Sequence, residues 1–185
     1  MKESPEIAIP EPGGPPAVCV VVSRYNGSIT ARMREAAEAT FRARVGDGGE
    51  IAFIDAPGTF ELAALTAAAI DTGLYDGVVA LGCVIKGETD HDKYISQAVA
   101  DALAILPVQT GIPVAFGVIT AGTPQQAAAR AGGEKGNKGA EAMDALLDTI
   151  AAMTHLAESA DRGERASFSL DRAATDKADS ESGEN

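Results

Sequence analysis

The sequence predicts an α/β protein, a three-layer α/β/α sandwich whose middle layer is a four-stranded parallel sheet of flavodoxin-like type. Four short apolar runs rich in Val and Ile are each followed by a longer segment with helically spaced apolar residues. Because the runs are apolar throughout rather than alternating, each strand is expected to be buried on both faces. Alternation of strand and helix is typical of a parallel sheet with helices on both sides.

The strands are expected where the apolar runs lie, at residues 17–23, 50–56, 77–85 and 113–120. The helices are expected where apolar residues recur at helical spacing: Ile29, Met33, Ala36 and Thr40; the alanine-rich segment 60–72; Ile95, Ala98, Val99, Ala102 and Leu106; and Met143, Leu146, Ile150 and Met153. Pro107 is expected to end the third helix, or to weaken its last turn before Gly111 closes it.

One domain, residues 17–157, is expected between two segments of different composition. A chain of 185 residues with 45% hydrophobic content fits one domain with a real core. Residues 1–16 are rich in proline, which predicts a loose or extended N-terminal arm. Residues 158–185 form an acidic tail whose only large apolar residues are Phe168 and Leu170, which predicts disorder.

The charge and the cysteines limit the classes of partner. A net charge of −12 argues against binding to nucleic acid or anionic membranes, so an anionic ligand must be held by a few local groups. Cys19 and Cys83 lie in apolar runs without metal-ligand spacing, which favours buried free thiols over a disulfide or a metal site. These thiols fit a cytoplasmic location, and no export signal or membrane span is indicated.

Polar, small and turn-forming residues follow each expected strand, in the stretches SRYNGS, DAPGTFE, KGETDH and TAGT. The carboxyl ends of the strands in a doubly wound sheet share one edge, where ligands bind. We therefore expect a group of residues that lie far apart in the sequence to converge there: Tyr25, Asn26, Gly58, Thr59, Glu61, Thr89 and His91.

The stretch KGETDH carries the most polar chemistry. A helix that begins directly after Gly87 would offer free backbone N–H groups to a phosphate, although Glu88 would repel a phosphate unless it points away. The alternative, that Thr89 or Asp90 merely caps the helix, stays open. His91 would lie in the first turn, where the helix dipole favours a neutral ring that exchanges protons near neutral pH.

Three other features have both a functional and a structural interpretation. The segment 123–139 holds Arg130, Lys135 and Lys138, which would complement a phosphate, or it is two short helices joined by a flexible turn with solvated cations. Glu61 would accept hydrogen bonds from a polyol in the functional interpretation, whereas in the structural one PGTFELAA is only a turn followed by a capped helix. Tyr25 would either pack against the protein or stack on a flat heterocycle. The second histidine, His155, is expected at the surface.

Five blocks of the sequence together resemble the motifs of the 6,7-dimethyl-8-ribityllumazine synthase family. They are RYNGSIT, PGTFELAA, LGCVIKGETDHDKY, PVAFGVIT and QQAAARAGGEKGNKGAEA, in this order and within residues 17–152. The resemblance implies a transferase of riboflavin biosynthesis that needs neither a metal nor an organic cofactor. Such an enzyme condenses 5-amino-6-(D-ribitylamino)uracil with 3,4-dihydroxy-2-butanone 4-phosphate.

The resemblance also implies residue roles. His91 is the proton-transfer residue, Tyr25 stacks on the pyrimidine, and Phe116 reaches the site from an adjacent subunit. The backbone of Glu88 and Thr89 binds the phosphate and Arg130 supplies its counter-charge. The implied substrate-binding set is Tyr25, Asn26, Gly58, Thr59, Phe60, Glu61, Cys83, Val84, Ile85, Glu88, Thr89, Phe116, Arg130 and Lys138. Lys86 and Asp92 depart from the usual arginine and aromatic residue, which bears on affinity more than on reaction type.

The resemblance implies a homo-oligomer as well, a pentamer that in some members packs further into an icosahedral shell. The short link GGEKGNKG permits the shell, and a functional link to riboflavin synthase is implied. Two alternatives are a flavodoxin-like module that binds FMN or another phosphorylated ligand, and a weakly active flavin-binding shell protein. The first explains a phosphate loop but not a histidine beside it or a distant cluster of cations.

Overall fold

The computed structural model describes residues 14–170. The first 13 residues of the expected arm and residues 171–185 of the expected tail lie outside the described residues. The chain divides into two compact units, residues 1–150 and 151–185. The first unit contains the sheet and the candidate site.

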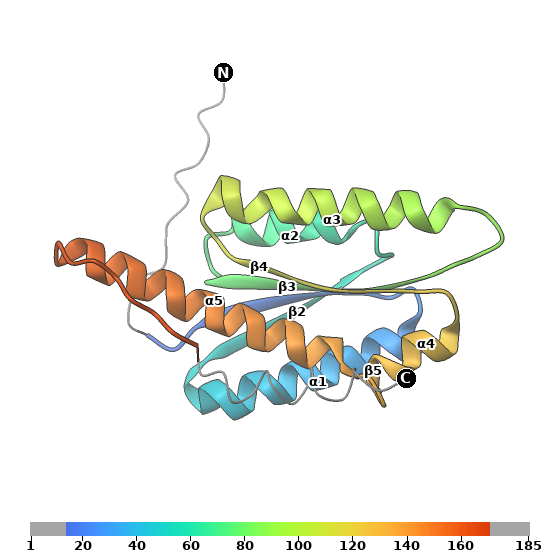
Figure 1. The fold of residues 1–185 in the computed structure, drawn as a ribbon, viewed down its shortest axis with the longest axis horizontal. Coiled ribbons are helices and arrows are strands. Elements are labelled where there is room, and N and C mark those ends of the chain that lie inside the picture. Colours follow the sequence, from blue (N-terminus) through green and yellow to red (C-terminus); the bar gives the residue numbers. More distant parts are fainter. Residues whose placement is uncertain (1–13, 171–185) are drawn as a thin grey trace, which may run out of the picture. The chain divides into compact units, whose positions relative to one another are not determined.

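Four parallel strands form the sheet of the first unit: β1 (Ala17–Ser23), β2 (Glu50–Ala56), β3 (Gly77–Ile85) and β4 (Val114–Ala121). Their order is β2-β1-β3-β4, with β2 and β4 at the edges (Figure 1). In the centre, Val21 pairs with Ile54 on one side and Ala80 on the other. The predicted strands are confirmed, and β4 is displaced by only one residue.

Helices cover both faces of this sheet, which confirms the three-layer α/β/α sandwich (Figure 1). One face carries α2 (Leu62–Asp71) and α3 (His91–Thr110). The other carries α1 (Gly27–Val45), α4 (Pro124–Ala129) and the first part of α5 (Lys138–Asp161). A single 3₁₀ turn, Gly46–Gly48, follows α1.

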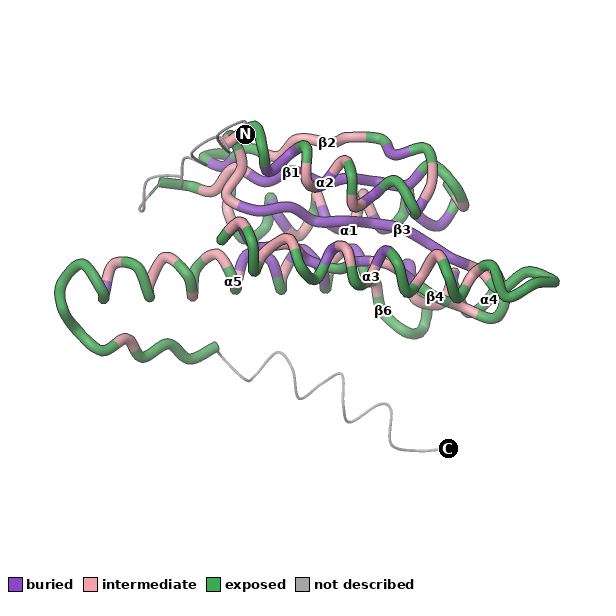
Figure 2. Tube along the Cα trace, turned by 90° about the horizontal axis from the view of Figure 1, so that it is seen from above, coloured by how far each residue is buried: buried purple, intermediate pink, exposed green. Residues whose placement is uncertain are grey.

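The central strands β1 and β3 are buried on both faces because their alternating side chains enter two separate cores (Figure 2). Val20 of β1 packs with Met33 and Phe41 of α1 in one core. Val21, the next residue, belongs to the other core with Leu62 and Leu103. An uninterrupted apolar run is therefore what these two strands require. The expectation of burial on both faces is wrong for the edge strands β2 and β4, which include the exposed residues Glu50, Asp55 and Phe116.

Of the two expectations for Pro107, the structure rules out that it ends α3 and bears out the closure of the helix at Gly111. The helix continues to Thr110 and ends at Gly111, whose N–H donates to the carbonyl of Pro107 at 3.0 Å. Gly111 has φ 74, a left-handed conformation that glycine adopts without steric cost. Because Pro107 lies in the last turn, its missing N–H removes only one helical hydrogen bond.

One expected alternative for residues 123–139 is two short helices joined by a flexible turn. The segment does contain α4 and the start of α5, but a β-hairpin joins them in place of a flexible turn. Its strands are β5 (Ala131–Gly133) and β6 (Gly136–Asn137), which pair in antiparallel fashion. The side chain of Asn137 fixes the hairpin, since its Nδ2 donates to the carbonyl of Arg32 at 3.2 Å and its Oδ1 accepts from the N–H of Gly139 at 2.9 Å. The hairpin is thus bonded to α1.

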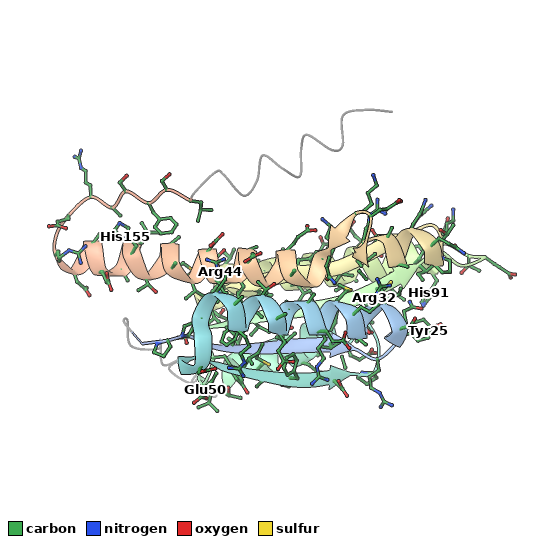
Figure 3. The ribbon with its side chains drawn as sticks, turned by 90° about the horizontal axis from the view of Figure 1, so that it is seen from below. Tyr25, Arg32, Arg44, Glu50, His91 and His155 are labelled. Carbon is green, nitrogen blue, oxygen red and sulfur yellow. The ribbon has the colours of Figure 1, made fainter. Side chains whose placement is uncertain are left out.

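In the second unit, α5 continues to Asp161, so the first residues of the expected tail are helical. The chain then reverses at Gly163, with φ 67, and the N–H of Glu164 donates to the carbonyl of Ser159 at 2.8 Å. His155, labelled in Figure 3, is half-buried, and its ring centroid lies 5.9 Å from that of Phe168. Within residues 14–170, no helix is both long and apolar enough to cross a membrane.

Candidate active site

A cavity of about 920 Å³ lies at the carboxyl ends of β1, β2 and β3. The strand order reverses between β1 and β3, and ligands of doubly wound proteins bind outside the sheet at this kind of switch point. Ligand pockets commonly measure about 300–1,000 Å³, so the cavity has room for two small molecules. In Figure 3, Tyr25 and His91 lie at the same end of the domain, while Glu50, the first residue of β2, lies toward the other end.

Most of the predicted site residues line this cavity. They are Tyr25, Asn26, Gly58, Thr59, Phe60, Glu61, Cys83, Val84, Ile85, Thr89 and His91. They come from the β1–α1 turn, the β2–α2 turn, the last residues of β3, and the β3–α3 loop with the start of α3. Four predicted residues do not line it: Glu88, Phe116, Arg130 and Lys138.

Asn26 joins the β1–α1 turn to the end of β3. Its Nδ2 donates to the carbonyl of Cys83 at 2.9 Å. Its backbone is left-handed, with φ 57 and ψ 43, and among the described residues no other non-glycine residue has a positive φ. Asparagine tolerates this conformation better than most residues, so Asn26 serves both as a turn residue and as a clamp.

Beneath the cavity, buried hydroxyl groups connect the same strand ends. The Oγ1 of Thr59 lies 3.5 Å from both the Oγ of Ser23 and the carbonyl of Cys83. Gly82 permits this approach, because a Cβ there would come within 2.9 Å of side-chain carbons of Thr59 and Leu62. The β2–α2 turn therefore lies directly against β3, and Tyr25, 71% exposed, stands free at the rim.

The thiol of Cys83 is a neutral part of the wall. Burial raises the pKa of Cys83 to about 11, and it raises the pKa of Cys19 to about 11 as well. Since only the thiolate is nucleophilic, Cys83 contributes its carbonyl and its bulk rather than a nucleophile. Both cysteines are buried and free, as expected.

Helix α3 begins at His91, three residues later than a start directly after Gly87 would place it. Asp90 occupies the N-cap position without a side-chain capping bond, and its carboxylate pairs instead with Lys93 at 3.0 Å. The N–H of His91 makes only a long contact of 3.5 Å with the Oγ1 of Thr89. The start of α3 is therefore weakly capped by its own side chains, which leaves donor capacity for a ligand.

Two of the three cations of residues 123–139, Arg130 and Lys138, make contacts outside the cavity. The Nη1 of Arg130 donates to the carbonyl of Gln126 at 3.0 Å, and Lys138 pairs with Glu141. Phe116, on edge strand β4, is 48% exposed and also lies outside. No Lys or Arg lines the described cavity, and among residues 14–170 no three His, Cys, Asp or Glu side chains are grouped to hold a metal ion.

The cavity also has a wall that the sequence analysis does not assign to the site. It consists of Gly87, Asp92, Tyr94, Ile95 and Ala98. The signal was present in the spacing, because positions three, four and seven residues after His91 share a face of a helix. Ile95 and Ala98 belong to the apolar pattern that predicts α3, and such a pattern does not distinguish a core from a pocket wall.

The fold and the cavity define a doubly wound α/β protein with a small-molecule site at its switch point. Residues 16–154 match the sequence model of the family described as 6,7-dimethyl-8-ribityllumazine synthase. Proteins with that name include one from Nautilia profundicola, 41% identical over 72% of this chain and 86% of its own length. Another, from Deinococcus deserti, is 36% identical over 76% of this chain and 90% of its own.

A third relative, 6,7-dimethyl-8-ribityllumazine synthase 1 from Caulobacter vibrioides, is 39% identical over 79% of this chain and 95% of its own length. The chain belongs to the 6,7-dimethyl-8-ribityllumazine synthase family, whose members are transferases of riboflavin biosynthesis. The family expected from the five sequence blocks is confirmed.

Proposed function

We propose that the chain catalyses the condensation of 5-amino-6-(D-ribitylamino)uracil with 3,4-dihydroxy-2-butanone 4-phosphate to 6,7-dimethyl-8-ribityllumazine. The observation that carries this proposal is the cavity at the switch point. It gathers an exposed aromatic ring, Tyr25, a carboxylate, Glu61, and a histidine, His91, from three separate segments. The aromatic ring can stack on a heterocycle, the carboxylate can accept hydrogen bonds from a polyol, and the histidine can transfer protons.

The reaction needs positioning and proton transfer. An amine of the pyrimidine adds to the ketone and water leaves to give an imine, after which phosphate is eliminated. The second amine then closes the ring with loss of a second water. Each step moves protons and none transfers electrons to or from the protein. Much of the acceleration is expected from holding the two substrates together in one cavity.

The residue roles implied by the family resemblance are proposed for residues that line the cavity. Tyr25 at the rim stacks on the pyrimidine, and Glu61 accepts hydrogen bonds from the ribityl hydroxyls. The backbone N–H groups around Thr89 and the start of α3 hold the phosphate, at the positive end of the helix dipole. His91, the first residue of that helix, moves protons between the substrates.

We propose that the site is completed by a neighbouring copy of the chain. The cavity has no cation of its own, although one substrate is a phosphate, while Phe116, Arg130 and Lys138 lie outside it. Apolar side chains on α3 also lack cover in the single chain, including Tyr94, which is 75% exposed, and Val108, which is 80% exposed. These observations support a homo-oligomer with shared sites.

The finer assembly is proposed from the family alone. The oligomer is a pentamer, or an icosahedral shell of pentamers, in the cytoplasm, and its product is passed to riboflavin synthase. The short hairpin between α4 and α5 adds no bulk that would obstruct contacts between pentamers.

The proposed activity is tested by mixing the full chain with both substrates. Lumazine fluorescence and inorganic phosphate are followed in parallel, and both are expected to increase at the same rate, well above the rate without protein. Tight binding of FMN without lumazine formation would instead favour a flavin-binding protein. Release of phosphate without lumazine would contradict the proposal, because the pyrimidine would then take no part.

A further inference from the structure

Asp92 lines the cavity but has no role in the proposed reaction. It is the second residue of α3 and lines the cavity beside His91 and Ile95. The family resemblance marks it only as a departure from an aromatic residue that bears on affinity, and no cation among the described residues lines the cavity to pair with its charge.

One carboxylate oxygen of Asp92 lacks a hydrogen-bond partner in the described part of the chain. Its Oδ1 is buried and has no hydrogen-bond partner among residues 14–170. Asp90 makes the contrast clear, since its carboxylate pairs with Lys93 at 3.0 Å. A buried oxygen without a donor costs about 1–3 kcal/mol, and more when it is charged, so such atoms in native proteins usually meet a ligand or water.

The position of Asp92 limits the kind of group that can bind to it. It lies in the first turn of α3, where the helix dipole stabilises a carboxylate. An ionised carboxylate accepts hydrogen bonds and donates none. The group that satisfies Asp92 must therefore be a donor, such as a hydroxyl or an amine.

The charge of the cavity wall selects between the two proposed substrates. Glu61 and Asp92 are both acidic, and no Lys or Arg lines the cavity. A phosphate placed beside either of these two carboxylates would be repelled. The ribitylaminopyrimidine carries no phosphate, and its ribityl chain offers several hydroxyl donors that are flexible enough to reach a carboxylate.

On the basis of the proposed function, we propose that Asp92 is a specificity-determining residue that accepts a hydrogen bond from a ribityl hydroxyl of the pyrimidine substrate. Asp92 and Glu61 then form an acidic polyol site in the cavity. The phosphate is held elsewhere, at the N–H groups around Thr89. The substrate supplies the donor that Asp92 lacks in the free chain.

The test compares Asp92→Ala and Asp92→Asn with the wild-type chain, using Asp90→Ala as the matched control. Asp90 belongs to the same stretch and is also acidic, but it does not line the cavity. Calorimetry with the pyrimidine alone is expected to show binding weakened about 10-fold or more in Asp92→Ala, since a hydrogen bond to a charged group contributes about 1.5–3 kcal/mol. Asp92→Asn keeps an acceptor oxygen and should lose less, and Asp90→Ala should change affinity less than about twofold.

A second ligand identifies the donor. A pyrimidine with a methyl group in place of the ribityl chain should bind to wild-type and Asp92→Ala chains equally. If Asp92→Ala weakens this analogue as much as the natural substrate, the donor is not a ribityl hydroxyl and the proposal is wrong. Unchanged affinity for the natural substrate in both Asp92 variants also overturns it.

Two further readouts separate this inference from others. Sedimentation of each variant checks the assembly, and dissociation of Asp92→Asn would show that Asp92 faces a neighbouring copy, which overturns the proposal. If Asp92→Ala does not fold, the nearly isosteric Asp92→Asn decides by its affinity. Failure of the wild-type chain to form lumazine refutes the proposed function itself, whereas wild-type turnover with unaffected Asp92 variants refutes only the present inference.

Discussion

His91 lies at the proposed phosphate-binding turn and can also transfer protons, and the reaction requires both phosphate binding and proton transfer. It is the first residue of α3, beside the weakly capped turn that holds the phosphate in the proposed function, and its ring lines the cavity. Imidazole can accept and release protons near neutral pH, which a reaction with several proton transfers needs.

His91→Ala is therefore expected to lower kcat by about 10²-fold or more, the usual contribution of a general acid or base. Substrate affinity should change little, because the backbone that binds the phosphate is unaltered. Steady-state kinetics on the intact assembly measure this effect. A variant that turns over as fast as the wild-type chain would remove His91 from the proton-transfer role.

The two buried thiols are expected to make the stability of the fold depend on pH in the alkaline range. Burial raises the pKa of Cys19 and of Cys83 to about 11, whereas an unfolded cysteine has a pKa of about 8.5. Below about pH 8.5 both states are protonated and this contribution to stability is fully present. As the pH rises toward 11 the unfolded chain loses protons first, so the contribution is progressively lost.

The thiolate absorbance of the folded chain should accordingly appear only near pH 11, and the Tm should fall between about pH 8.5 and 11. The denatured chain is the control and should titrate about two units lower. Rapid reaction of native Cys83 with a thiol reagent at neutral pH would show that the thiol is neither buried nor neutral.

At the scale of the elements, the turns after the strands decide the shape of the site. Asn26 fixes the β1–α1 turn by its left-handed backbone and by its bond to Cys83. The two contributions can be separated by substitution. Glycine adopts the left-handed backbone conformation but cannot form the side-chain hydrogen bond, whereas alanine disfavours the conformation and also lacks the hydrogen bond.

We expect the free energy of unfolding to fall in the order wild type, Asn26→Gly, Asn26→Ala. Loss of the bond is worth about 1 kcal/mol, and a left-handed alanine costs about 1–2 kcal/mol more. Denaturant unfolding measures the order. If Asn26→Ala is as stable as Asn26→Gly, the left-handed turn is not held as described.

The strands could be predicted closely because their signal is local: a strand buried on both faces has to be apolar throughout. The start of α3 could not be predicted closely, because KGETDH is compatible with both a helical turn and a loop. Only the packing of the folded chain determines which of the two forms. The hairpin from Ala131 to Asn137 was missed for a similar reason. Glycines allow a turn, but the bond from Asn137 to Arg32 joins segments far apart in the sequence.

For the whole molecule, the composition of the site also depends on contacts between distant segments, which the sequence alone does not determine. The sequence places residues at strand ends, and the sheet then brings most of them to one cavity. Of the residues that do not line this cavity, only Phe116 was expected, from the family resemblance, to reach the cavity of another chain. That Arg130 and Lys138 also lie outside it became visible only in the folded chain.

Shared sites can be tested by complementation. Arg130→Ala and His91→Ala chains are each expected to form nearly inactive oligomers. In mixed oligomers some sites combine an intact His91 with an intact Arg130 from the neighbour, so co-expression should restore part of the activity. Absence of any recovery, with mixed oligomers demonstrated by mass spectrometry, would place both residues of a site on one chain.

The central claim is that the cavity between the ends of β1, β2 and β3 binds the lumazine product. A crystal structure of the full chain with that product tests it most directly. The heterocycle is expected on the ring of Tyr25, with its ribityl chain toward Glu61 and Asp92 and with His91 beside the newly formed ring. A product bound outside this cavity, with the cavity itself unoccupied at saturating concentration, would contradict the account.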